Sequence, residues 1–302
     1  MGKIRTRNQY QAEFVKCIQK FGGKYQTWEI FADFISMFAC AISNGIDRVH
    51  FKPREEMYMQ IIRKYTKEEQ AIFPEMMGHV INGMEENRDC DFLGELYMAL
   101  DLGSHWKGQF FTPYSLCKMT AQLQKNDIEQ EIKANGFVSV NDPACGAGAL
   151  LVAVANTAAE EIKQFNWQNH ILFVAQDIDA VTAKMCYTQL SLLGCAGYVK
   201  IGDTMANPIT ANESLYEMTK EDSCYWYTPM YFNDVWNWRR MFHMFDKTMQ
   251  KNITITNNDE KEKTAQPVEN SQDIDRNEFN TEKNGQLSLF RNEFGYGNYK
   301  SK

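Results

Sequence analysis

The chain has 302 residues, of which 44% are hydrophobic and 24% are charged, and its formal net charge at pH 7 is −7. This composition is typical of a globular protein, with length for one large domain or two modest ones. It contains no run of 18 apolar residues, which excludes a membrane-spanning helix of the usual kind, and the acidic balance argues against tight DNA binding by the chain alone.

The N-terminal region, residues 1–107, is predicted to be helical. From residue 28 to residue 43, large apolar side chains recur at spacings of three and four residues, which is the period of a helix with one buried face. The members of this stripe are Trp28, Phe31, Phe34, Ile35 and Phe38. We interpret nearly all Met and aromatic residues of the region as core packing.

After residue 107 the pattern changes, and apolar runs begin to alternate with helical patterns. Strands are predicted over residues 137–142, 170–177 and 198–203, helices over 149–165 and 180–194, and residues 224–228 are a candidate fourth strand. Alternating strands and helices predict a doubly wound, mostly parallel α/β sheet. We assign residues 108–250 to this domain.

A glycine-rich turn separates the first predicted strand from the helix after it. Gly146 and Gly148 lack a Cβ atom, so the chain can bend sharply and bring backbone amides close to a ligand at the start of a helix. The dinucleotide fingerprint G-x-G-x-x-G needs a third glycine where the chain has Leu151, and no G-K-[ST] of a P-loop follows. The turn therefore argues against a nicotinamide-dependent oxidoreductase.

Three acidic residues follow three successive predicted strands: Asp142, Asp177 and Asp203. In open α/β sheets ligands bind at the carboxyl ends of the strands, and an acid after the second strand can accept hydrogen bonds from ribose hydroxyls. Three acids suit a neutral ribose and a cationic sulfonium better than a polyphosphate. The sequence therefore predicts a nucleoside site of this kind.

Two motifs in this order resemble those of the adenine-specific DNA methyltransferases. They are G-Q-F-F-T-P at residues 108–113 and N-D-P-A-C-G-A-G at 141–148, and the similarity to the modification subunit of type I restriction systems covers roughly residues 90–235. The resemblance implies a Rossmann-like methyltransferase sheet and S-adenosylmethionine as cofactor.

The resemblance also implies which residues hold this cofactor. The methionine end would be wrapped by two segments, Asp177 would hold the ribose and Asp203 would meet the adenine. The residues of the two segments are Phe111, Thr112, Pro113, Asp142, Pro143, Ala144, Cys145, Gly146 and Gly148.

Methylation of the adenine amino nitrogen requires a further motif, [ND]-P-P-[YF], which is absent from the sequence. The segment Asn207-Pro208-Ile209-Thr210 begins correctly but lies four residues after Asp203, so we interpret it as a loop. The segment Thr228-Pro229-Met230-Tyr231 follows the candidate fourth strand, and we take Thr228, Pro229 and Tyr231 as the catalytic candidates. A Thr hydroxyl can accept a hydrogen bond from the amino group, and an aromatic ring can stack on a flipped base.

The sequence is compatible with two functions. One is a DNA methyltransferase that acts on the adenine amino nitrogen. The other is a catalytically impaired relative that serves as an adaptor and binds cofactor or DNA.

The C-terminal tail, residues 251–302, is polar and is expected to be disordered. Within it, Gln286, Leu287, Ser288, Leu289 and Phe290 resemble the pentapeptide by which bacterial replication and repair proteins dock on the DNA polymerase sliding clamp. The alternative is a short strand or helix that folds back on the domain. Clamp binding would bring an acidic chain to DNA by raising its effective concentration there.

DNA is the expected substrate, and a partner is expected to direct the chain to it. We expect the large target-recognition region of monomeric relatives to have no counterpart here, so recognition would come from another subunit, such as a specificity subunit, or be absent. The eight cysteines form no C-x-x-C and only five histidines accompany them, so we predict free thiols, no metal site and a reducing, cytoplasmic location.

Overall fold

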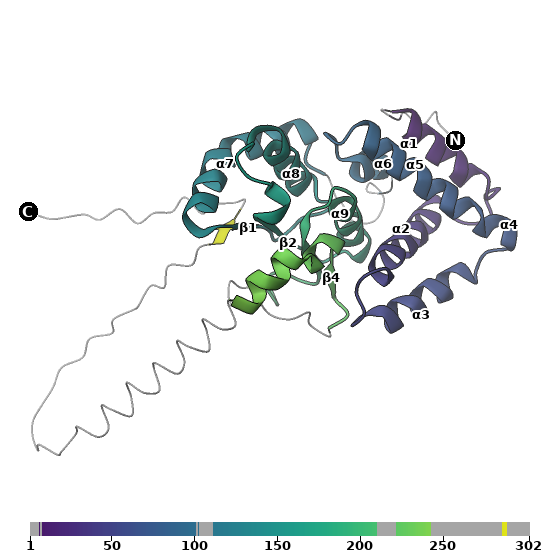
Figure 1. Ribbon diagram of the computed structural model, residues 1–302. Coiled ribbons are helices and arrows are strands. Elements are labelled where there is room, and N and C mark those ends of the chain that lie inside the picture. Colours follow the sequence, from purple (N-terminus) through teal and green to yellow (C-terminus); the bar gives the residue numbers. More distant parts are fainter. Residues whose placement is uncertain are drawn as a thin grey trace, which may run out of the picture.

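The computed structural model describes residues 6, 8–100, 102, 111–209, 222–242 and 286–288 (Figure 1). Its elements, in chain order, are α1 (Gln9–Gln19), α2 (Thr27–Asn44), α3 (Phe51–Ile62), α4 (Lys67–Gln70), α5 (Ile72–Glu86), α6 (Phe92–Ala99), α7 (Tyr114–Asn135), β1 (Val138–Asp142), α8 (Ala149–Glu161), the 3-10 helix η1 (Trp167–Asn169), β2 (Ile171–Asp177), α9 (Ala180–Leu192), β3 (Ala196–Ile201), β4 (Tyr225–Tyr227), the 3-10 helix η2 (Pro229–Phe232) and β5 (Gln286–Ser288). Residues 234–242 are also helical.

The strands form a mostly parallel sheet in the order β4-β3-β2-β1-β5. Strands β1, β2 and β3 run parallel to one another, and β4 pairs with β3 in the antiparallel direction. The three strands predicted over residues 137–142, 170–177 and 198–203 are present with small shifts at their ends. The expectation of a mixed α/β fold with a mostly parallel sheet is therefore confirmed.

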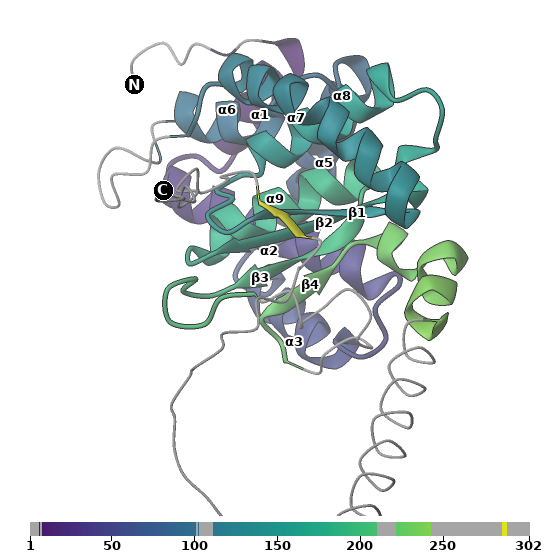
Figure 2. The same ribbon diagram turned by 90° about the vertical axis from the view of Figure 1, so that its left-hand side faces the viewer.

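Helices cover one face of the sheet thickly. The crossover helices α8 and α9 pack there with α7 over the apolar side chains of β1, β2 and β3, and Figure 2 shows α7 and α8 above the strands. The opposite face carries a smaller aromatic cluster around Tyr198, Tyr227 and Trp236, supplied partly by η2 and the helix after it. Both faces of the central strands are thus buried, which explains why their sequences are almost continuously apolar.

Local signals set the ends of two helices that frame the sheet. Helix α7 ends because Gly136 takes a left-handed conformation, with φ of 77°, and its amide donates to the carbonyl of Ile132 at 2.8 Å. Helix α9 begins after Asp179, whose carboxylate accepts from the amides of Val181 at 2.9 Å and Thr182 at 3.1 Å.

The N-terminal helices build their own apolar core and pack directly on α9 through α2 and α6. Phe31, Phe34, Ile35 and Phe38 are buried as predicted for the stripe on α2. Trp28 departs from that prediction, because 62% of its surface is exposed in the first turn of the helix.

A buried cation fastens the helical region to the antiparallel strand β4. The guanidinium of Arg54 on α3 lies 4.1 Å from the centre of the Trp226 ring and donates to the carbonyl of Tyr225. It also donates to the buried carboxylate of Asp47 at 2.8 Å. The pairing with Asp47 offsets the cost of burying the charge, and the contacts of Arg54 with Trp226 and Tyr225 join α3 to β4.

The backbone of Gln286–Ser288 forms β5, which runs parallel to β1 with Gln286 opposite Ser139. This arrangement corresponds to the alternative in which the pentapeptide begins a strand that returns to the domain. The predicted disorder of residues 251–302 otherwise falls outside the described residues, as do Leu289 and Phe290.

Across the described part of the chain, no helix is both long and apolar enough to cross a membrane.

Candidate cofactor site at the carboxyl ends of the strands

The parallel strands bring the three predicted carboxylates to one edge of the sheet. Asp142 is the last residue of β1 and Asp177 is the last residue of β2, while Asp203 follows β3 by two residues. In the strand register Asp142 lies opposite Ala175, and Asp177 lies opposite Ile201. The edge therefore presents three acids side by side, where ligands bind in open α/β sheets.

The glycine turn follows β1 and requires both of its glycines. Gly146 and Gly148 have positive φ angles of 51° and 92°, a region that other residues seldom adopt. A Cβ atom at Gly148 would also lie only 2.7 Å from the Sγ of Cys186. The turn leads directly into α8, so the free backbone amides at the start of that helix lie at this edge.

Asp177 connects the glycine turn to the start of α9. One carboxylate oxygen accepts from the amide of Gly146 at 2.8 Å. The other accepts from the amide of Asp179 at 2.8 Å and the hydroxyl of Thr182 at 3.2 Å. These donors fix the orientation of the carboxylate, and because such a group offers about four acceptor positions, capacity remains for a ribose hydroxyl.

Asp142 is almost fully buried beneath the turn. Burial raises the pKa of its carboxyl to about 6, the charge of Asp177 adds to the shift, and a hydrogen bond from the amide of Ala144 opposes it. A cationic group bound beside Asp142 would favour its ionised form. The carboxyl is thus suited to a positively charged ligand.

The segment before α7 supplies an aromatic wall for the glycine turn. A Cβ atom built at Gly146 would lie 3.2 Å from the ring of Phe111, so this ring lies against the turn. The ring of Phe111 also lies 5.3 Å from that of Tyr97 on α6, centre to centre. Thr112 and Pro113 are exposed and lead into α7. Residues 108–110 of the motif lie outside the described part of the chain.

The loop after β3 is tied to the other two loops by residues that the motifs do not identify. The amide group of Gln176 donates to the carbonyl of Asn207 at 2.9 Å and accepts from the amide of Ile209 at 3.2 Å. The hydroxyl of Thr204 donates to the carbonyl of Pro143 in the glycine turn. The sequence contains one signal for this network, a polar Gln near the end of an apolar strand.

A buried polar network supports the glycine turn from below. The amide of Gln189 on α9 donates to the carbonyl of Ala147 at 2.9 Å and to the carboxylate of Asp91 at 2.8 Å. Asp91 also accepts from the amide of Gly94 at 3.0 Å, which caps α6. Burial raises the pKa of Asp91 to about 6, and its two hydrogen bonds oppose that shift. The network links α6, α9 and the turn.

The structure does not bring the catalytic candidates Thr228, Pro229 and Tyr231 to this edge. Because β4 runs antiparallel to β3, its carboxyl end lies at the amino end of β3. The hydroxyl of Thr228 donates to the carbonyl of Cys195 at 2.7 Å and accepts from the amide of Gly197 at 3.0 Å. Gly197 and Asp203 lie six positions apart along a mostly extended segment, which places them at most roughly 20 Å from each other. The exposed fractions of Thr228 and Tyr231 are 0% and 1%.

The other candidate segment does lie at the carboxyl edge. The amide of Asn207 donates to the carbonyl of Asp203 at 2.8 Å, and the carbonyl of Asn207 accepts from Lys200 at 2.9 Å. Asn207 and Pro208 are exposed, whereas Ile209 is buried. The loop is therefore held at its backbone, and the side chain of Asn207 is exposed to solvent.

A mostly parallel sheet with a glycine turn, an aromatic wall and three carboxylates at one edge is the arrangement of α/β proteins that bind nucleoside ligands at the carboxyl ends of their strands. The family described as N-6 DNA Methylase matches the sequence over residues 90–263, which is more than half of the chain, so the chain belongs to this family. Membership implies S-adenosylmethionine as the cofactor.

Further comparisons add little to this assignment. A solved structure from Listeria monocytogenes, provisionally assigned as a class I S-adenosylmethionine-dependent methyltransferase, is similar with 15% identity and a TM-score of 0.39. The similarity covers 67% of this chain and 56% of that one, so the chain spans little more than half of its length. A search of curated proteins finds no match.

Proposed function

We propose that this chain transfers the methyl group of S-adenosylmethionine to the amino nitrogen of adenine in DNA. The observation that carries the proposal is the gathering of Asp142, Asp177 and Asp203 around the turn of Gly146 and Gly148, in a chain of the N-6 DNA methylase family. The cofactor would supply a methyl group activated by a sulfonium: attack by the adenine nitrogen would break the carbon–sulfur bond, leave a neutral thioether and release one amino proton to solvent.

The chain's own residues would bind and orient this cofactor. Phe111, Thr112, Pro113 and the turn from Asp142 to Gly148 would enclose its methionine end, and the carboxylate of Asp142 would balance a positive charge there. Asp177, already oriented by Gly146 and Thr182, would accept from a ribose hydroxyl. Asp203 would accept from the amino group of the cofactor's adenine.

We assign recognition of the amino group of the target adenine to Asn207 rather than to Thr228. The side-chain amide oxygen of Asn207 can accept a hydrogen bond from the amino group, which directs the nitrogen lone pair toward the methyl group. The position of Asn207 supports this assignment, because the residue is exposed and its backbone amide donates to the carbonyl of Asp203. The hydroxyl of Thr228, in contrast, is buried at the amino end of β3, where it donates to the carbonyl of Cys195. The segment departs from the family motif at Ile209 and Thr210, where a second proline and an aromatic residue are usual.

A partner would direct the chain to DNA, as in a restriction–modification system. The pentapeptide Gln286–Phe290 would dock on the sliding clamp, which encircles DNA and would raise the local concentration of an acidic chain. Docking would require Gln286–Ser288 to leave the edge of β1. A specificity subunit is the alternative source of targeting.

A catalytically impaired adaptor is the second candidate function, and the departure from [ND]-P-P-[YF] is the observation that favours it. Single-molecule sequencing of genomic DNA from a methylation-deficient bacterium that expresses the chain separates the two. We expect methylated adenines in a fixed sequence context, and none with the Asp142→Ala, Asp177→Ala double variant. Unmethylated DNA from cells whose protein still binds S-adenosylmethionine would support the adaptor.

A further inference from the structure

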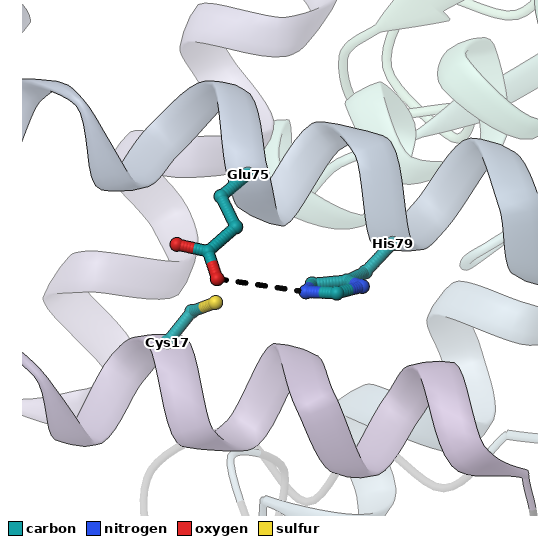
Figure 3. A group of neighbouring side chains, drawn as sticks. All are labelled: Cys17, Glu75 and His79. Atoms are coloured by element: carbon teal, nitrogen blue, oxygen red, sulfur yellow. Dashed lines mark ion pairs between the residues drawn. The ribbon is translucent and has the colours of Figure 1, made fainter.

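Three side chains that can bind metals meet between α1 and α5, away from the cofactor site. Cys17 belongs to α1, and Glu75 and His79 lie one turn apart on α5 (Figure 3). The Sγ of Cys17, a carboxylate oxygen of Glu75 and a ring nitrogen of His79 all lie within 4.8 Å of one another. The Nε2 of His79 is 3.9 Å from the Oε1 of Glu75.

The geometry of this group is close to that of a zinc site. Zinc binds thiolate, imidazole and carboxylate ligands at 2.0–2.3 Å in tetrahedral arrangements, so its ligand atoms are roughly 3.3–3.8 Å apart. Small changes of rotamer would bring the three donors to those separations. Residues at i and i+4, such as Glu75 and His79, face the same side of a helix, and here that side faces α1.

The group is open to solvent on one side. Cys17 is buried, the side chain of His79 is 21% exposed and that of Glu75 is 45% exposed. A cation can therefore enter from solvent, and a water molecule can take the fourth position.

In the structure, the carboxylate of Glu75 pairs with a lysine. The Nζ of Lys20 lies 2.7 Å from both carboxylate oxygens of Glu75, and about half of the Lys20 side chain is exposed. An exposed ion pair of this kind contributes little stability, so the ammonium can leave when a divalent cation arrives. Metal binding at Cys17 requires the cation to displace the thiol proton, and soft thiolate ligands favour a thiophilic metal such as zinc.

We propose that Cys17, Glu75 and His79 bind a zinc ion that fastens α1 to α5. The site does not depend on the methyltransferase function, because its ligands lie on helices that contribute no residue to the carboxyl edge of the sheet. Metal binding would stabilise the helical region, since a ligand that binds only the folded chain shifts the unfolding equilibrium.

The test is titration of the full-length, metal-free protein with Co²⁺ as a spectroscopic probe, followed by displacement with Zn²⁺. We expect one equivalent to give thiolate-to-cobalt absorption and the strong visible bands of a tetrahedral site. At a hundredfold excess of Zn²⁺ over its Kd, the Tm should rise by roughly 5 °C.

Variants locate the binding. His79→Gln and Cys17→Ser should each lose the spectrum and the Tm shift, and the matched control Cys224→Ser should keep both. Lys20→Gln should bind about two to five times more tightly, because the competing ammonium is gone. A spectrum in His79→Gln equal to that of the natural chain, or weaker binding by Lys20→Gln, would overturn the proposal. His79→Gln replaces a partly exposed side chain, so it tests the site even if Cys17→Ser fails to fold.

Discussion

The two ends of the β-sheet carry similar residue types but differ in what those residues can do. At the carboxyl end, Asp177 has spare acceptor capacity and Asn207 is exposed. At the amino end, the hydroxyl of Thr228 accepts from the amide of Gly197 in β3 and donates to the carbonyl of Cys195, just before that strand. We infer that a polar residue next to a proline is a candidate for catalysis only if it lies at the end of the sheet where we propose that the ligand binds.

Aromatic packing explains why the amino end is closed. The ring of Tyr231 packs on Tyr227, with centres 4.8 Å apart, and the guanidinium of Arg240 lies 4.2 Å from the centre of the Tyr231 ring. The indole of Trp236 donates to the carbonyl of Gln168 at 2.9 Å. These rings are held in the core of this face and are not available to stack on a base.

The largest expected effect comes from the glycine turn at the carboxyl end. Gly148→Ala adds a Cβ atom at a positive φ and against the Sγ of Cys186, so the turn must shift. We expect S-adenosylmethionine affinity to fall at least about a hundredfold, by about 2.7 kcal/mol or more, as measured by isothermal titration calorimetry.

Gly78→Ala is the matched control for this change. Gly78 lies inside α5, and an added Cβ atom there meets no atom within 4 Å. Because alanine favours a helix over glycine, the variant should bind the cofactor normally and gain up to about 1 kcal/mol of stability. If the two variants bound the cofactor equally well, the turn would not be part of the site.

An intermediate effect is expected at the amino end, on stability rather than on binding. Thr228→Val removes the hydroxyl and leaves the amide of Gly197 and the carbonyl of Cys195 without that partner. The free energy of unfolding should fall by about 1–3 kcal/mol, measured by chemical denaturation. Asp203→Ala is the converse case: its exposed carboxylate accepts from the amide of Met205 at 2.8 Å, so its loss should cost no more than about 1 kcal/mol of stability yet weaken cofactor binding. Weakened cofactor binding by folded Thr228→Val would contradict the contrast.

The features that can be predicted from the sequence also differ from those that cannot in the range of the contacts on which they depend. The three parallel strands and the glycine turn depend on local signals, namely continuous apolar runs and glycines at positive φ. The direction of β4 does not follow from local signals. It depends on contacts with Tyr198 in the neighbouring strand β3 and with Arg54 in a helix that is distant in the sequence. A short aromatic strand gives no sign of whether its neighbour runs parallel or antiparallel.

Individual residues show the same limit. Asp142, Asp177 and Asp203 can be found from their places at strand ends. The roles of Gln176 and Thr204 appear only when the loops are side by side, because their partners are backbone carbonyls elsewhere in the chain. Trp28 fits the helical period of its stripe but lies in the first turn of α2, where no neighbouring element buries it.

The smallest expected effect is a dependence of cofactor binding on pH. The pKa of Asp142 is raised to about 6 in the folded chain, from a usual value of 3.8, so the carboxyl becomes protonated as the pH falls through 6. A cationic ligand prefers the ionised form, so affinity should fall by up to about tenfold per pH unit below 6. The free energy of unfolding of the ligand-free protein should change in the opposite sense. A raised carboxyl pKa makes the folded state relatively more stable as the pH falls from 6 toward 4.

Calorimetric titrations at several pH values check this prediction, with Asp142→Asn as the control. The variant cannot titrate at this position, so its affinity should be lower at neutral pH and less dependent on pH. Asp91, whose pKa is also raised to about 6, is present in both proteins, so its titration cannot cause a difference between their pH profiles. Identical pH profiles for the two proteins would exclude Asp142 as the group responsible.

The most direct test of the account compares the two ends of the sheet in one assay. Asn207→Ala, Thr228→Val and the natural chain are expressed at equal levels in a methylation-deficient bacterium, and the methylated fraction of target adenines is measured by sequencing. Cofactor affinity is measured on the purified proteins. We predict that Asn207→Ala loses methylation by about a hundredfold or more with cofactor affinity unchanged, as expected for the loss of a group that acts on the reacting atoms. Folded Thr228→Val should retain most of the methylation that the natural chain produces. Loss of methylation in Thr228→Val with retention in Asn207→Ala would contradict the account.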